Sequence, residues 1–185
     1  MRIKNILDEN VKANKEIDFY TPIRIDYEDN DDKEKELFYY RLLNLNSSFV
    51  EVSISSTTKK IVSIVVVSIN DIVEVEKEAM EKLDFVGELG NPEIDMTLFE
   101  QEHVVTDNIN FKVMRHEKKI YVICNNERIK KKLVMDNLDI LLDDKSNVIG
   151  YIFSGFTEKE WNEINKSIDS SIGVVMEHQR DYWSS

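Results

Sequence analysis

The chain has 185 residues, of which 42% are hydrophobic and 32% charged, a composition that excludes a largely disordered protein. Its formal net charge of −12 disfavours broad contact with nucleic acid, because the phosphate backbone repels an acidic surface. The first residues lack the apolar core of a signal peptide, the longest apolar run is too short to cross a bilayer, and Cys124 is the only cysteine. We therefore expect a cytoplasmic protein without disulfides and without membrane contact.

Residues 1–27 predict a helix followed by a strand. Apolar residues recur at roughly helical spacing through residues 1–16, which indicates a short N-terminal helix. The stretch IDFYTPIRIDY (17–27) alternates polar and apolar side chains and predicts a strand that begins near Pro22.

The next stretch, DYEDNDDKEKE (26–36), packs seven carboxylates into eleven residues. An EF-hand calcium loop that starts at Asp26 would need a glycine where Asp31 stands and an acidic twelfth residue where Leu37 stands. A loop that starts at Asp29 fails too, with Lys33 at a ligand position. The stretch is therefore not predicted to bind a metal, and it is either a solvated linker or a surface for a cationic partner.

Three strands are predicted after the acidic stretch. They are ELFYYRLLNLN (36–46), SFVEVSIS (48–55) and IVSIVVVSI (61–69), and the polar STTKK joins the last two as a hairpin turn. The third run is almost wholly apolar, so we expect a central strand covered on both faces. Asp71 and Glu74 then form a capping-box pattern, and helical spacing up to Leu83 predicts a helix that ends near the GELGNP sequence at 87–92.

The second half of the chain repeats much of this plan. QEHVVTDN, NFKVMRH and KKIYVICN predict a meander, RIKKKLVMDN predicts a strand, and LDILLDDKSNVIGYIFSGF predicts a hairpin. Thr157 and Glu160 form a second capping box, with Trp161, Ile164 and Ile168 on the apolar face of the helix that follows.

The predicted fold class is α+β, with mostly antiparallel sheets of hairpins covered by helices. The segments from 48 and from 138 share the order strand, polar turn, apolar strand and capped helix. Such units recur widely in unrelated proteins, so their likeness need not mean common origin. We expect one domain over residues 1–185, either undivided or built from two similar halves at 17–90 and 97–172.

The sequence predicts no catalytic, metal or cofactor site. His103, His116 and His178 stand in no metal-binding pattern, the serines form no nucleophile elbow, and no glycine-rich loop could cradle a phosphate. Basic residues cluster at RHEKK (115–119) and ERIKKK (127–132). They could contact phosphate, but a solvated face or protection of an edge strand accounts for them more simply.

In overall character the chain resembles the immunity proteins of bacterial toxin systems. The resemblance lies in three passages, DYEDNDDKEKELFYYRLL, SFVEVSISSTTKKIVSIVVVS and LDDKSNVIGYIFSGFTEKEW. It implies a non-catalytic protein that neutralises a cognate basic toxin or nuclease, and it carries over no functional residue.

An electrostatic binding mode identifies candidate contacts for such a partner. These are Asp26, Glu28, Asp29, Asp31, Asp32, Glu34 and Glu36, with Tyr27, Tyr39 and Tyr40 as aromatic anchors or, alternatively, as packed sheet residues.

Two other functions remain open at this stage. One is an enzyme or small-ligand protein whose site is assembled from scattered residues that include His103 or His116. The other is a structural module that associates with itself, as a homodimer for instance, through an edge strand or the tail around Trp183.

Overall fold

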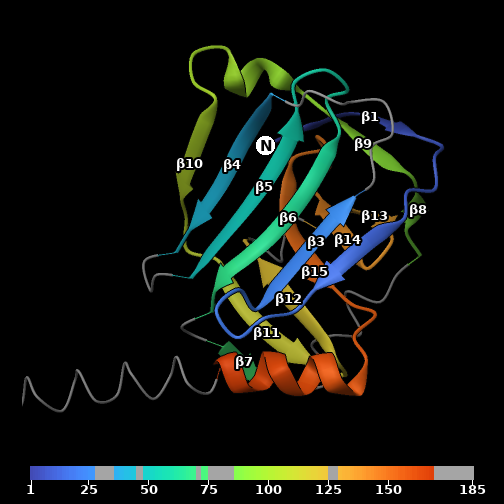
Figure 1. Ribbon diagram of the computed structural model, residues 1–185. Helices are drawn as coiled ribbons and strands as arrows, with labels where there is room; N and C mark the ends of the chain where they lie inside the picture. The colour runs from blue at the N-terminus through green and yellow to red at the C-terminus, as the bar shows by residue number, and fades with distance from the viewer. Residues whose placement is uncertain (28–35, 45–47, 70–71, 75–85, 125–128, 169–185) are drawn as a thin grey trace, which may run out of the picture.

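The computed structural model describes residues 1–27, 36–44, 48–69, 72–74, 86–124 and 129–168, and these form a β-sandwich. Two large sheets lie face to face in Figure 1, and a two-stranded ribbon joins them at one end. The described residues contain one α-helix, residues 158–168, which lies at the opposite end of the sandwich. The α+β prediction, with sheets covered by helices, is therefore wrong, because each sheet covers a face of the other.

The first sheet has six strands in the order β10-β4-β5-β6-β3-β2. All neighbours are antiparallel except β10 and β4, which are parallel. As predicted, β6 is a central strand, and the adjacent Ile64 and Val65, on its opposite faces, are both buried. The strands are β2 (Ala13–Glu16), β3 (Ile23–Tyr27), β4 (Leu37–Leu43), β5 (Phe49–Ser55), β6 (Ile61–Ser68) and β10 (Val104–Asn108).

The second sheet has seven strands in the order β7-β11-β12-β15-β14-β13-β8. The two outermost pairs, β7 with β11 and β13 with β8, are parallel, and the others are antiparallel. The strands are β7 (Ile72–Glu74), β8 (Glu88–Leu89), β11 (Lys112–His116), β12 (Lys119–Ile123), β13 (Lys131–Met135), β14 (Leu138–Leu142) and β15 (Val148–Phe153).

Five strands of each sheet follow the same path. In the first sheet a hairpin, β2–β3, precedes a meander, β4–β5–β6, whose last strand pairs with β3. In the second sheet the hairpin β11–β12 precedes the meander β13–β14–β15, whose last strand pairs with β12. The first strand of each meander also carries a parallel partner on its outer edge, β10 on β4 and β8 on β13.

The ribbon of β1 (Ile3–Leu7) and β9 (Asn91–Ile94) connects these two five-strand units. The Ile3 N–H donates to the carbonyl of Ser146 at 2.9 Å, in the β14–β15 turn. The Ile94 N–H donates to the carbonyl of Lys59 at 2.8 Å, in the β5–β6 turn. Because Ile3 and Ile94 are also partners of each other, the ribbon holds the equivalent turns of both sheets.

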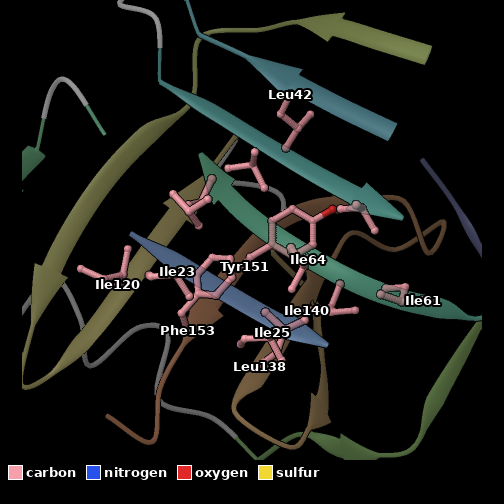
Figure 2. Close-up of a cluster of buried hydrophobic side chains, with 14 of the residues drawn as sticks. Ile23, Ile25, Leu42, Ile61, Ile64, Ile120, Leu138, Ile140, Tyr151 and Phe153 are labelled. Carbon is pink, nitrogen blue, oxygen red and sulfur yellow. The ribbon is translucent and has the colours of Figure 1, made fainter. Parts of the chain in front are cut away.

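The main core fills the space between the two sheets (Figure 2). Ile23 and Ile25 of β3 lie in one cluster with Ile140 of β14 and with Tyr151 and Phe153 of β15. All five side chains are fully buried. Alternating side chains of both sheets build this cluster, so burial of apolar surface between the sheets is the main source of stability.

Two predicted helices and the meander need correction. Residues 1–16 form β1 and β2 instead of a helix, because their backbones pair with β9 and β3. The helix predicted to start at Asp71 is wrong at Ile72–Glu74, where β7 pairs with β11, and residues 70–71 and 75–85 lie outside the described ranges. The predicted meander is wrong at β10, which pairs with β4 in the other sheet.

The start of the helix at 158–168 confirms the second capping box. The Thr157 N–H donates to Glu160 Oε2 at 2.7 Å, and the Glu160 N–H donates to Thr157 Oγ1 at 3.3 Å. Ile164 and Ile168 are buried, as predicted, and Trp161 packs beside Phe156. Gly155, with φ of +71°, makes the turn from β15 into this helix.

Candidate acidic binding surface

The ends of the acidic stretch lie at one end of the first sheet. Asp26 and Tyr27 close β3, and Glu36 directly precedes β4. Because the pairs β3–β6, β6–β5 and β5–β4 are all antiparallel, the end of β3 and the start of β4 lie on the same side. The other predicted contacts, Glu28, Asp29, Asp31, Asp32 and Glu34, lie outside the described residues.

Tyr27 is part of the fold where the acidic stretch begins. Its side chain is 4% exposed, and its hydroxyl donates to the carbonyl of Asp136 at 3.1 Å, in the β13–β14 turn of the other sheet. Burial raises the pKa of this hydroxyl well above its usual range. Tyr27 therefore fixes the start of the stretch and is not exposed as an aromatic anchor.

The other two candidate tyrosines, Tyr39 and Tyr40 of β4, are also engaged in the fold. Tyr40 is buried, and its hydroxyl donates to the Asp107 carboxylate on β10. Tyr39 is half-buried, with the Arg41 guanidinium 6.0 Å from the centre of its ring. Both pack on the sheet, in line with the alternative interpretation of these residues.

Asp26 and Glu36 differ in how far their charges are balanced. Asp26 accepts two hydrogen bonds from the Arg24 guanidinium, at 2.7 and 2.8 Å, and this carboxylate raises the pKa of Arg24. The Glu36 side chain is 64% exposed, and its Oε1 lies 3.5 Å from Nδ1 of His103. Glu36 thus presents the more accessible negative charge.

Further carboxylates lie beside Glu36. Because β10 runs parallel to β4, His103, which precedes β10, lies at the same end of the sheet. The His103 ring packs on Phe38 with centroids 4.7 Å apart, and Glu100 and Glu102 beside it in the sequence are exposed. We call this region the acidic end, defined by Asp26, Glu36, Glu100 and Glu102.

A hollow of about 460 Å³ lies next to the first residues of the acidic stretch. One wall is the segment that joins β1 to β2, and the other is formed by the parallel strands β8 and β13. The Tyr27 hydroxyl contacts Asp136 in this second wall, so the hollow adjoins the end of β3. The lining residues are Asp8, Glu9, Asn10, Val11, Lys12, Leu89, Gly90, Val134, Met135 and Asp136.

Three carboxylates and one ammonium group line this hollow. Asp136 Oδ2 accepts the Ala13 N–H at 3.1 Å, and Glu9 Oε2 lies 2.7 Å from the ammonium of Lys60. Among the described residues, Asp8 and Lys12 form no ion pair or hydrogen bond through their side chains. Sequence reasoning did not identify this site, because the segment 8–12 was assigned to a helix and the lining comes from distant parts of the chain.

The main core contains a second polar group, the hydroxyl of Tyr151. The hydroxyl of this fully buried residue has no hydrogen-bond partner among the described residues. Burial raises the pKa of the nearby Cys124 thiol to about 12, so the thiol is protonated and a poor nucleophile at neutral pH.

The histidines that could have supported an enzyme site lie apart from the hollow. His116 Nε2 is 3.7 Å from Glu117 Oε1, and neither His116 nor His103 lines the hollow, while His178 lies outside the described ranges. Within the part of the chain that the structure describes, no three His, Cys, Asp or Glu side chains are arranged to hold a metal ion.

The predicted basic face is only partly exposed. Lys132, in the basic cluster at 127–132, has a side chain 11% exposed, and its ammonium lies 3.9 Å from Asp139 Oδ2. Arg128 lies outside the described residues. In the other basic cluster, Lys118 pairs with Glu158, and Arg115 donates to Asn165 Oδ1 at 2.9 Å, so both hold the helix.

Comparison with protein-family models and with curated protein sequences found no match to the chain.

The described residues include no helix with the length and apolar character needed to cross a membrane.

Proposed function

We propose that this chain is a non-catalytic acidic binding protein that docks a basic protein partner through the acidic end. A bacterial toxin or nuclease that the chain neutralises is the partner that its resemblance to immunity proteins suggests. The observation that carries the proposal is the anchoring of a stretch with seven carboxylates in eleven residues at Tyr27 and Glu36, beside the exposed Glu100 and Glu102.

The physical basis is electrostatic complementarity. An enzyme that acts on a polyanion has a positive active site, and carboxylates on a firm scaffold can occupy it in place of phosphates. Opposite charge accelerates association at low salt and contributes less once the Debye length falls to about 8 Å at physiological ionic strength. Asp26 closes β3 and Glu36 directly precedes β4, so the sheet holds these two carboxylates before a partner binds and lowers the entropy cost of docking at these positions.

The first test is capture of the partner from the native host, followed by an assay of its activity. The expected partner is a basic protein whose toxic or nucleolytic activity falls when the chain is added in equal amount. Recovery of only a second copy of the chain would instead support the self-associating module. A captured protein that is acidic, or whose activity is unaffected, would contradict neutralisation.

The second test reverses charge in the acidic stretch. Asp29→Lys, Asp31→Lys and Asp32→Lys together should slow association with the captured partner and reduce its salt dependence. The matched control carries Glu16→Lys, Glu117→Lys and Glu163→Lys, which give the same change of charge on strand, turn and helix residues away from the acidic end. Equal rates for the two triple variants, measured by stopped-flow or surface plasmon resonance, would defeat the assignment of the contact surface.

A further inference from the structure

The hollow beside Tyr27 has the chemistry of a receptor for one cationic side chain. Its lining includes the carboxylates of Asp8, Glu9 and Asp136, the ammonium of Lys12 and the buried Met135. A volume of about 460 Å³ falls within the range of small-ligand sites. We infer that this hollow receives an arginine side chain of the basic partner, an inference that rests on the proposed function and adds a specific subsite to it.

Two of the carboxylates suit this role for different reasons. Asp136 is held in place, because Oδ2 accepts the Ala13 N–H at 3.1 Å and Oδ1 accepts from the Asn137 amide at 2.9 Å. Asp8 is exposed and forms no ion pair among the described residues, so its charge is available to an incoming guanidinium. A guanidinium has five donors in a plane and can bridge two carboxylates, which the compact ammonium of lysine does less well.

Apolar side chains suit the aliphatic stem of the same residue. Leu89, which lines the hollow, is apolar and yet 74% exposed. The methylene groups of arginine pack on such surfaces while the charged head stays among polar groups. Exposed apolar side chains beside a charged rim are typical of protein contact sites.

The position of the hollow makes it continuous with the acidic end. Tyr27 closes β3 and also binds the Asp136 carbonyl, so one buried residue joins the wall of the hollow to the start of the acidic stretch. A partner that lies over the stretch can therefore place an arginine in the hollow in the same encounter.

A titration with N-acetyl-arginine amide tests the subsite without the partner. Amide signals of Leu89, Gly90 and Val134–Asp136 should shift in ¹⁵N-HSQC spectra of the full chain and saturate together. The neutral isostere N-acetyl-citrulline amide should produce much smaller shifts at the same concentration. Equal shifts with both probes, or shifts spread evenly over the surface, would overturn the inference.

Neutral variants locate the charge that binds. Asp8→Asn should lower the affinity for N-acetyl-arginine amide about two- to fivefold, as expected for loss of one partly exposed ion pair. Glu117→Gln is the matched control, since it removes one exposed charge from a turn in the second sheet, and it should leave the affinity unchanged. Equal affinities for the two variants would overturn the role of Asp8.

The partner assay separates failure of the subsite from failure of the function. The triple reversal at Asp29, Asp31 and Asp32 could weaken binding of the captured partner while Asp8→Lys and Leu89→Ser leave it unchanged. In that case the subsite is wrong and the proposed function stands. If none of these variants affects the partner, the proposed function fails as well.

Discussion

At the scale of single residues, Lys15 shows how one cation joins the two sheets. It belongs to β2 of the first sheet, and its side chain is only 10% exposed. Its ammonium donates to the carbonyl of Gly155, lies 3.5 Å from Glu160 Oε2 and sits 4.9 Å from the centre of the Phe156 ring. A charge this far from water is tolerated because each of these groups compensates for lost hydration.

Glu160 is the acidic member of this cluster, and its pKa predicts a pH dependence. Partial burial raises the pKa, but hydrogen bonds from the Thr157 N–H and hydroxyl, together with the Lys15 ammonium, outweigh that effect and hold the pKa below its ordinary value of 4.5. A carboxyl whose pKa is lower in the folded state stabilises the fold above the unfolded-state pKa. The stabilisation is lost as pH falls through the folded-state pKa.

We therefore expect Glu160→Gln to flatten the acid limb of the stability curve. The melting temperature of the wild-type chain should fall more steeply than that of the variant as pH decreases below about 4.5, the ordinary pKa of a glutamate. Glu163→Gln, on the same helix and paired with Lys166, is the control and should follow the wild type. Parallel curves for Glu160→Gln and wild type would show that Glu160 is not a main source of acid sensitivity.

At the scale of elements, the β5–β6 and β14–β15 turns are built alike. Each connects its strands through five residues, 56–60 and 143–147. A buried side chain at the start of each turn accepts backbone N–H groups: Ser55, the last residue of β5, and Asp143, the first residue of the second turn. The Ser55 hydroxyl accepts from Thr57 and Thr58, and the Asp143 carboxylate accepts from Lys145 and Asn147. These caps stabilise the turns where the ribbon of β1 and β9 attaches.

Each turn also contains one residue in the left-handed region. These are Lys59 with φ of 61° and Ser146 with φ of 63°. We predict that Ser146→Gly increases the free energy of unfolding by about 0.5–1 kcal/mol, because glycine adopts this conformation without a Cβ penalty. Ser146→Ala removes the hydroxyl but keeps the Cβ, so it should be no more stable than the wild type. Urea unfolding that ranks alanine at or above glycine would contradict this backbone explanation.

Prediction of the elements succeeded where side-chain pattern and local chemistry agreed. The alternation in 48–55, the apolar run in 61–69, the hairpin at 138–156 and the Thr157–Glu160 box all match the structure. It failed at residues 1–16, where a loose spacing of Ile3, Ile6 and Val11 fits a helix and also fits two short strands. Strands this short are stabilised by their partners, which lie far away in the sequence.

At the scale of the whole molecule, the two five-strand units depend on strands exchanged between them. β10 follows β9 in the chain but joins the first sheet, while β7 follows β6 but joins the second. β1 pairs with β9 across the junction. Each segment therefore leaves sheet edges and core surface exposed when the other is absent.

We expect the fragments 1–80 and 81–185 to be poorly structured alone and to fold when mixed. Separation breaks the pairings β1–β9, β4–β10 and β7–β11 and exposes the inner faces of both sheets. Dispersed amide signals in a ¹⁵N-HSQC spectrum should appear only for the mixture. A well-dispersed spectrum of either fragment alone would show that one unit is stable without the exchanged strands.

The sequence by itself determined the acidic character, the strongly patterned strands, the polar turns and the capped helix, because each depends on residues close together in the chain. Only the tertiary structure decided that two sheets cover each other, that β10 and β7 cross between them, and that Asp8, Leu89 and Asp136 border one hollow. Strand partners and pocket walls are selected by apolar burial and backbone pairing between distant segments, and no local pattern encodes that choice.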